Sequence, residues 1–186
     1  MAAPNDLHIL AGTGSRSLQE APLADKYRAA ELTAAELEER RSRFGDRLVV
    51  MSGMAEGFDK LLALTALRLD IKLWCAVPNH GYGAYYWGRK SLTGEDRLAE
   101  FERILAAAWQ VTYVMEDIHH TSGLKLNGKH SNFVRNDFMV ERAHEFLVWN
   151  PTSSGTKQCL ATIVRSGRPY KVLDATTAGT LFAEED

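Results

Sequence analysis

The sequence predicts an α/β domain with a mainly parallel sheet of about six strands and about five helices. Short apolar runs of strand length alternate with longer segments whose apolar residues recur at helical spacing, which is the pattern of βαβ units. Three of the apolar runs lead into turns rich in glycine and serine, at residues 12–16, 52–57 and 150–156. The chain has 186 residues, 45% of them hydrophobic and 25% charged, which suits one globular domain over residues 1–186 with a core from about 7 to 174.

The first quarter of the chain contains one strand and one helix in this interpretation. Residues 7–11 form an apolar run of strand length, and a Gly-Thr-Gly turn follows at once. Thr33 and Glu36 have the spacing of a capping box, so we expect a helix to begin there and to end near Phe44, with Gly45 as its C-terminal stop. Residues 17–32 have no clear periodicity and are expected to be irregular.

The middle of the chain repeats the alternation of strand and helix. Strands are expected over residues 48–51 and 71–77, with a helix between them that ends near Leu69. The loop after Pro78 contains a dense aromatic group, Tyr82, Tyr85, Tyr86 and Trp87. Packing of these rings onto the body of the protein is the preferred interpretation, and stacking on a base or a dimer contact are the alternatives.

The last part of the chain continues the same order. We expect a helix at 95–108, a strand at 111–115, a polar loop at 116–130, a helix at 131–143, a strand at 146–149, a helix that ends near Gly167, a strand at 170–173 and a polar tail at 175–186. Strands separated by helices in this way form parallel sheets with right-handed crossovers.

Histidine and cysteine provide no strong indication of a metal site. His119, His120 and His130 lie in one polar segment, but no acidic or thiol cluster has ligand spacing with them, so no metal and no other cofactor is expected. Cys75 and Cys159 each lie in an apolar context and are interpreted as buried thiols rather than as a disulfide pair.

The charge balance restricts the possible partners. The formal net charge is -2 and the pI is near 6.3, whereas a protein whose main partner is nucleic acid needs a basic excess. A leader of charged and then apolar residues and an apolar run near 18 residues are both missing from the sequence, so a cytoplasmic location without membrane contact is expected.

The three small-residue turns predict a shared ligand site. In a parallel sheet, all turns from a strand into the next helix lie at the carboxyl edge, where ligands bind at the switch point of the strand order. The turn at 150–156 follows the apolar strand and opens a helix, so it offers backbone N–H groups and a positive helix end that suit phosphate. The turn at 12–16 lacks the third glycine of the dinucleotide fingerprint. A nucleotide-like small molecule is therefore the expected ligand.

Five segments resemble the SLOG superfamily of Rossmann-like proteins, which includes the DNA-processing DprA proteins and the Lonely-guy phosphoribohydrolases. They are AGTGSRS at 11–17, VVMSGMAEGFDKLLALTAL at 49–67, AVPNHGYGAYYWG at 76–88, VRNDFMVERAHEFLVW at 134–149 and SSGT at 153–156. Within the superfamily, the chain is most similar to the YpsA-like branch. The resemblance implies a Rossmann-like three-layer sandwich.

The resemblance also implies a site for a nucleotide derivative that is built from these turns. Gly14, Ser15 and Arg16 would lie under the phosphate, and Gly155 and Thr156 would hold it. The other implied ligand-binding residues are Gly12 and Thr13 from the first turn, Ser52, Gly53, Glu56 and Gly57 from the second, Arg135 and Asn136 from the helix at 131–143, and Asn150, Ser153, Ser154 and Lys157 from the third turn.

One departure from the superfamily separates two possible functions. Lonely-guy enzymes carry a PGGxGTxxE motif whose glutamate takes part in cleaving the N-glycosidic bond, but here Gln158 and Cys159 follow Lys157. Without that carboxylate, we expect a protein that senses or sequesters a phosphorylated ribose-containing metabolite, such as an ADP-ribose-like or cyclic nucleotide. The alternative is a nucleotide N-glycosidase, phosphoribohydrolase or deoxyribosyltransferase that uses Glu56 or Asp59.

Two further expectations concern assembly and the absence of a ligand. A homo-oligomer, a dimer or higher, is expected for the folded chain. An interaction module whose turns hold no ligand is the third possible function.

Overall fold

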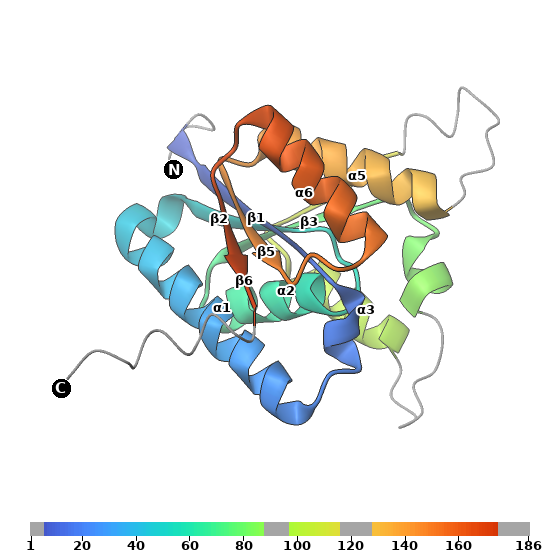
Figure 1. The fold of residues 1–186 in the computed structure, drawn as a ribbon, viewed down its shortest axis with the longest axis horizontal. Helices are drawn as coiled ribbons and strands as arrows, with labels where there is room; N and C mark the ends of the chain where they lie inside the picture. The colour runs from blue at the N-terminus through green and yellow to red at the C-terminus, as the bar shows by residue number, and fades with distance from the viewer. Residues whose placement is uncertain (1–5, 88–96, 116–127, 175–186) are drawn as a thin grey trace.

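Six parallel strands form one sheet with the order β4-β3-β2-β1-β5-β6. Figure 1 shows the sheet between helices. The computed structural model describes residues 6–87, 97–115 and 128–174. The strands are β1 (His8–Gly14), β2 (Leu48–Ser52), β3 (Lys72–Val77), β4 (Gln110–Tyr113), β5 (Glu145–Trp149) and β6 (Tyr170–Leu173). In the register of the sheet, Gly12 pairs with Ser52 of β2 and Gly14 with Trp149 of β5, so the three strands end near the same edge.

Helices cover both faces of the sheet. They are α1 (Leu23–Phe44), α2 (Phe58–Arg68), α3 (Arg97–Ala107), α5 (Gly128–Arg142) and α6 (Ser154–Ser166), together with the short segments η2 (Arg16–Gln19), η3 (Gly45–Arg47) and η4 (Gly83–Trp87). The first three helices contribute to one hydrophobic cluster and the last two to another, on opposite faces of the sheet. The chain is therefore a Rossmann-like three-layer sandwich with a parallel sheet of six strands, as predicted.

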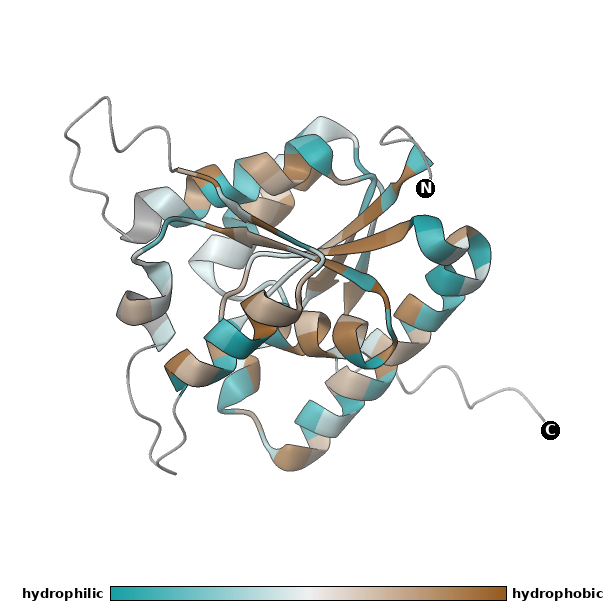
Figure 2. Ribbon diagram, turned by 180° about the vertical axis from the view of Figure 1, so that it is seen from behind, coloured by the Kyte–Doolittle hydropathy of each residue, from teal (hydrophilic) through white to brown (hydrophobic). Residues whose placement is uncertain are grey.

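Alternation along the strands distributes the apolar side chains between the two layers. Leu10 and Val50 pack against the layer of α1, α2 and α3, whereas their neighbours Ala11 and Met51 pack against α5 and α6. Successive side chains of a strand point to opposite faces, so a strand buried on both faces becomes apolar at every position. Figure 2 shows mostly apolar strands between helices that carry both polar and apolar residues.

The long helix α1 differs from its prediction. It begins at Leu23, so residues 23–32 are helical rather than irregular, and Thr33 lies in the middle of the helix. The Thr33 hydroxyl donates to the Ala29 carbonyl at 2.7 Å, one turn back. Glu36 does not cap the helix, because its carboxylate accepts from Arg40 at 2.7 Å. The capping box at Thr33 therefore predicted the wrong start for this helix. The residue before the first turn is Pro22, which makes no side-chain hydrogen bond to the helix end.

The other elements lie close to their predicted positions. Helix α1 ends at Phe44, and its C-cap Gly45 has a positive φ of 54°, which glycine adopts readily at a helix C-terminus. Helix α5 begins three residues earlier than predicted, at Gly128. The rest of the predicted polar loop, residues 116–127, and the predicted polar tail at 175–186 lie outside the described residues.

Both cysteines are buried free thiols, as predicted. Burial raises the pKa of Cys75 to about 12 and that of Cys159 to about 11. Thiols with such pKa values carry almost no thiolate at neutral pH, so they belong to the packed interior rather than to reactive chemistry.

Among residues 6–87, 97–115 and 128–174, no helix is both long and apolar enough to cross a membrane. The cytoplasmic location stays a prediction.

His144 fixes the turn between α5 and β5 against the central strand β1. Its backbone N–H donates to the Ile9 carbonyl at 2.8 Å, and the Ile9 N–H donates to the ring Nδ1 at 2.9 Å. A ring nitrogen that accepts a hydrogen bond must be unprotonated. Burial lowers the pKa of His144, the charges of His8 and Arg168 lower it further, and Glu145 opposes this effect.

This arrangement predicts a loss of stability in mild acid. A histidine with a lowered pKa in the folded state binds fewer protons than in the unfolded chain, so its contribution to stability is complete above about pH 6.5 and declines as the pH falls. His144→Asn retains an acceptor near Nδ1 but does not titrate. We expect denaturant unfolding of His144→Asn to depend less on pH between 7 and 5 than unfolding of the wild-type protein. Equal pH dependence in both proteins would contradict this assignment.

Candidate functional site

A cavity of about 630 Å³ opens at the carboxyl edge of the sheet, above the neighbouring strands β1 and β5. After β1 the chain builds the sheet outward through β2 to β4, and α5 then leads it to β5 on the other side of β1. This is the switch point of the strand order, where ligands of open parallel sheets bind. The cavity is lined by Thr13, Gly14, Ser15, Arg16, Ser17, Glu20, Ala55, Asp59, Asn132, Phe133, Arg135, Asn136, Ser153, Ser154, Gly155 and Thr156.

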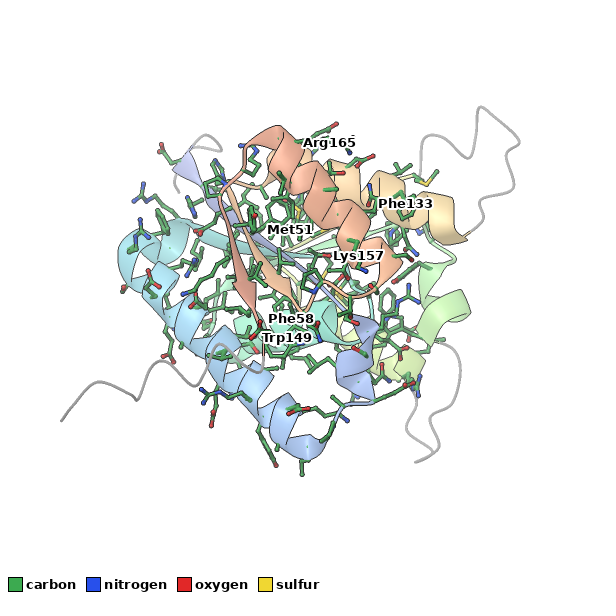
Figure 3. The ribbon with its side chains drawn as sticks, viewed as in Figure 1. Met51, Phe58, Phe133, Trp149, Lys157 and Arg165 are labelled. Atoms are coloured by element: carbon green, nitrogen blue, oxygen red, sulfur yellow. The ribbon has the colours of Figure 1, made fainter. Side chains whose placement is uncertain are left out.

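The turn after β1 forms one side of the cavity. The Ser15 N–H donates to the Trp149 carbonyl at 3.2 Å, which extends the pairing of β1 with β5 by one residue. The Ser15 hydroxyl accepts the Ser17 N–H at 3.2 Å and thereby caps η2. At Gly14, a Cβ would lie 2.4 Å from the Cβ of Phe58 and 2.8 Å from that of Trp149. Close packing of these two rings therefore requires glycine here, independently of any ligand (Figure 3).

The turn after β2 packs behind the turn after β1. The Ser52 hydroxyl donates to the Asp59 carbonyl at 2.8 Å and accepts the Met54 N–H at 3.1 Å. Gly57 has a φ of 89°, and a Cβ there would lie 2.7 Å from the Ser15 carbonyl oxygen. Both the backbone conformation and the contact require glycine at position 57. The second turn therefore supports the first from behind.

Arg135 of α5 reaches from the opposite face of the sheet into the wall of the cavity. Its side chain donates through Nε to the Asn136 amide oxygen at 3.0 Å and through Nη1 to the Gly53 carbonyl. Nη1 also lies 3.7 Å from a carboxylate oxygen of Asp59. A Cβ at Gly53 would collide with the guanidinium, so the glycine leaves the space that Arg135 occupies.

Arg135 and Asp59 form a buried ion pair that lines the cavity. They are only 6% and 4% exposed. Burial raises the pKa of the Asp59 carboxyl, and the positive charge of Arg135 opposes this rise. The Ala55 N–H, at 3.4 Å, and the Gly14 N–H also donate to the Asp59 side chain. One carboxylate therefore connects the turn after β1, the turn after β2 and helix α5.

The first turn of α6 closes the third side of the cavity. Ser153 is the N-cap, and its hydroxyl accepts the Thr156 N–H at 3.3 Å. The first backbone bond of the helix runs from the Lys157 N–H to the Ser153 carbonyl at 2.9 Å. The N–H groups of Ser154 and Gly155 come before that bond and have no acceptor within the helix. The cavity is therefore bordered by a positive helix end with backbone donors.

The structure brings ten of the seventeen predicted ligand-binding residues to the cavity, namely Thr13, Gly14, Ser15, Arg16, Arg135, Asn136, Ser153, Ser154, Gly155 and Thr156. Gly12 packs under Leu62 of α2 within the strand. Ser52, Gly53 and Gly57 support the wall from behind, as described above. Asn150, with a φ of 38°, belongs to the turn itself, and Lys157 is exposed on α6 outside the lining.

The two predicted catalytic carboxylates lie in different places. Glu56 is outside the lining, and its Oε1 accepts from Arg97 at 3.0 Å and from Gln19 at 3.3 Å. Asp59 is part of the lining, and its carboxylate accepts a hydrogen bond from the Ala55 N–H in the preceding loop.

Five lining residues were not predicted from the sequence, namely Ser17, Glu20, Ala55, Asn132 and Phe133. Helical spacing would have identified two of them, because Asn132 and Phe133 precede Asn136 by four and three residues and share its helix face.

The aromatic loop packs onto the body of the protein where its side chains are described. Trp87 is 1% exposed, its indole N–H donates to the Met54 carbonyl at 3.0 Å, and its ring centroid lies 5.2 Å from that of Phe101. Tyr82 is also buried. The packing interpretation is confirmed for these two rings, and the side chains of Tyr85 and Tyr86 lie outside the description.

Metal ligation has little support in the part of the chain that the structure describes. No group of three or more His, Cys, Asp or Glu side chains there has the geometry to hold a metal ion. His119, His120 and the side chain of His130 lie outside the described residues.

Comparison with known proteins identifies the fold. No protein-family model and no curated protein matches the chain. DNA processing protein A (DprA) from Streptococcus pneumoniae is similar in structure, with a TM-score of 0.56 and 16% sequence identity over 89% of this chain and 50% of DprA. TM1055, a structural genomics target, is similar with a TM-score of 0.53 and 11% identity over 88% of this chain and 72% of TM1055.

The chain spans half the length of DprA. At these identities, the likeness establishes the fold and leaves the ligand open. The chain has the Rossmann-like α/β fold of DprA and TM1055, as its resemblance to the SLOG superfamily predicts, whereas its place in the YpsA-like branch stays a prediction.

Proposed function

We propose that this protein binds a phosphorylated ribose-containing metabolite in the cavity above β1 and β5, with the phosphate at the first turn of α6. The observation that carries the proposal is the convergence of three features on one cavity. These are the backbone donors at the start of α6, the buried guanidinium of Arg135 and the side chain of Arg16. Backbone N–H groups at a helix end and arginine are the groups that proteins use to bind phosphate.

The size and lining of the cavity favour a small metabolite over a bare ion or a polymer. Small-molecule sites have volumes of about 300–1,000 Å³, and this cavity of about 630 Å³ exceeds what inorganic phosphate fills. The serine and threonine hydroxyls that line it suit the hydroxyls of a sugar. DprA is described as a DNA processing protein, but the net charge of -2 makes nucleic acid a poorer partner for this chain.

Binding to four probes tests this proposal. We expect ribose 5-phosphate, AMP and ADP-ribose to raise the melting temperature of the protein, and adenosine, which lacks phosphate, to leave it unchanged. Calorimetric titration with the same compounds provides the dissociation constants. A protein whose melting temperature responds to none of them, or to adenosine as strongly as to AMP, would contradict the proposed phosphate site.

The second candidate function is the cleavage of an N-glycosidic bond with Asp59 as the acid or base. Asp59 favours it because this carboxyl lines the cavity and burial raises its pKa, which suits proton transfer. Glu56 is the weaker candidate, because its carboxylate accepts from Arg97 outside the lining. Incubation with 5′-mononucleotides followed by chromatography for free base separates catalysis from binding alone. For an enzyme, Asp59→Asn would abolish base release while Glu56→Gln would retain it.

A further inference from the structure

Phe133 is the one aromatic side chain among the described residues that line the cavity. It is half-buried and lies in the second turn of α5. The other described rings that the sequence offers for stacking on a base, Tyr82 and Trp87, are buried in the core. Among the described lining residues, Phe133 is therefore the aromatic surface that a ligand in the cavity would meet.

The placement of Phe133 follows from the arrangement of α5 and α6. The two helices pack side by side on the same face of the sheet, and both run antiparallel to the strands, so both begin at the carboxyl edge. Phe133 and Asn136 are three residues apart and share one helix face. Asn136 lines the cavity and donates to Gln158 of α6 at 2.9 Å. Phe133 on α5 (Figure 3) therefore lines the same cavity as the first turn of α6.

The chemistry of the ring selects one part of the ligand. A phenyl ring offers no hydrogen bond to phosphate or to a sugar hydroxyl, but its face stacks well on a nucleobase. We propose that Phe133 stacks on the base of a 5′-nucleotide whose phosphate lies at the first turn of α6. This inference rests on the proposed function and makes it more specific, because it names a nucleotide rather than a base-free sugar phosphate as the ligand.

The experiment compares AMP with ribose 5-phosphate, which lacks the base, by calorimetric titration. Wild-type protein is expected to bind AMP about tenfold to a hundredfold more tightly than ribose 5-phosphate, since stacking on one aromatic ring contributes about 1–3 kcal/mol. Phe133→Leu keeps an apolar side chain but lacks the ring. We expect it to bind ribose 5-phosphate as wild type does and to lose most of the preference for AMP.

Two further variants control this comparison. Phe138→Leu removes a ring from the same helix at a position where it packs edge-on against Trp74, with centroids 5.9 Å apart, and should retain the preference for AMP. Phe133→Trp places a fluorophore in the wall, and AMP but not ribose 5-phosphate should quench the emission added to that of the four native tryptophans. This second readout does not depend on the folding of Phe133→Leu.

The outcomes separate the inference from the function on which it rests. Binding of neither compound by wild type would contradict the phosphate site itself. Equal affinity of wild type for both compounds would retain that site and overturn the role of Phe133. An undiminished preference for AMP in folded Phe133→Leu, or no quenching by AMP in Phe133→Trp, would also overturn it.

Discussion

Gly155→Asp is expected to fold like the wild-type protein and to lose about a hundredfold or more of its affinity for AMP. Gly155 is the second residue of α6, and a Cβ built there meets no atom within 4 Å. The new carboxylate would occupy the space of the phosphate, repel its charge and remove charge-assisted contacts worth about 1.5–3 kcal/mol. Without ligand, a negative charge in the first helix turn stabilises by about 0.3–1 kcal/mol, so the melting temperature should not fall.

A matched variant on the same helix separates the effect of a charge at position 155 from the effect of an added negative charge in general. Ala161→Asp adds the same charge at an exposed site, about 9 Å further along α6. It should bind AMP nearly as well as the wild-type protein does, because solvent screens a charge at that distance. If both variants retain full affinity for AMP in calorimetry, the phosphate does not lie at the first turn of α6.

Arg135→Ala is expected to lower the free energy of unfolding at pH 7 by about 3–5 kcal/mol, which is a large share of the stability of a domain. The variant leaves the Asp59 carboxylate buried without its positive partner. It also removes the donors to Gly53 and Asn136. Denaturant unfolding measures the loss. It also shows whether enough of this variant is folded for its affinity for AMP to be measured. A loss below about 1 kcal/mol, typical of a surface ion pair, would contradict the buried pair.

The pH dependence of this loss identifies its cause. The folded-state pKa of Asp59 is already raised in the wild-type protein, and removal of Arg135 should raise it further. A carboxyl with a raised pKa stabilises the fold at low pH, and its contribution is lost as the pH increases from about 3.9 through the folded-state value. The stability deficit of Arg135→Ala relative to wild type should therefore shrink from pH 7 to pH 5. The double variant with Asp59→Asn should show a smaller deficit at pH 7 and little change with pH.

The sequence was sufficient to predict the sheet and the edge at which the cavity lies. Continuous apolar runs such as 146–149 indicate strands that are buried on both faces, and β5 confirms this. Parallel strands end at one edge, so the small-residue turns after β1, β2 and β5 had to meet there. The start of α1 could not be predicted in the same way, because Pro22 provides no side-chain cap and the capping signal at Thr33 is internal to the helix.

The contacts of individual side chains could not be predicted from the spacing of residues along the sequence. Arg135 and Asp59 lie 76 positions apart in the sequence, and only the approach of α5 to the turn after β2 makes them a pair. Gly14 is required by the rings of Phe58 and Trp149 rather than by a nearby ligand. Helical spacing from Asn136 indicates the face of α5 that carries Phe133, but the packing of α5 against the sheet and α6 is what places that face at the cavity.

The position of β1 in the strand order affects how the protein is made on the ribosome. β1 to β4 lie within the first 113 residues, but the partner on the other side of β1 is β5, at residues 145–149. Until β5 has emerged, one edge of β1 is an unpaired apolar strand, the kind of surface that nascent chains aggregate through and that chaperones cover. The wall formed by α5 and α6 is also synthesised late, so the nascent protein has four strands of its sheet before it has the cavity.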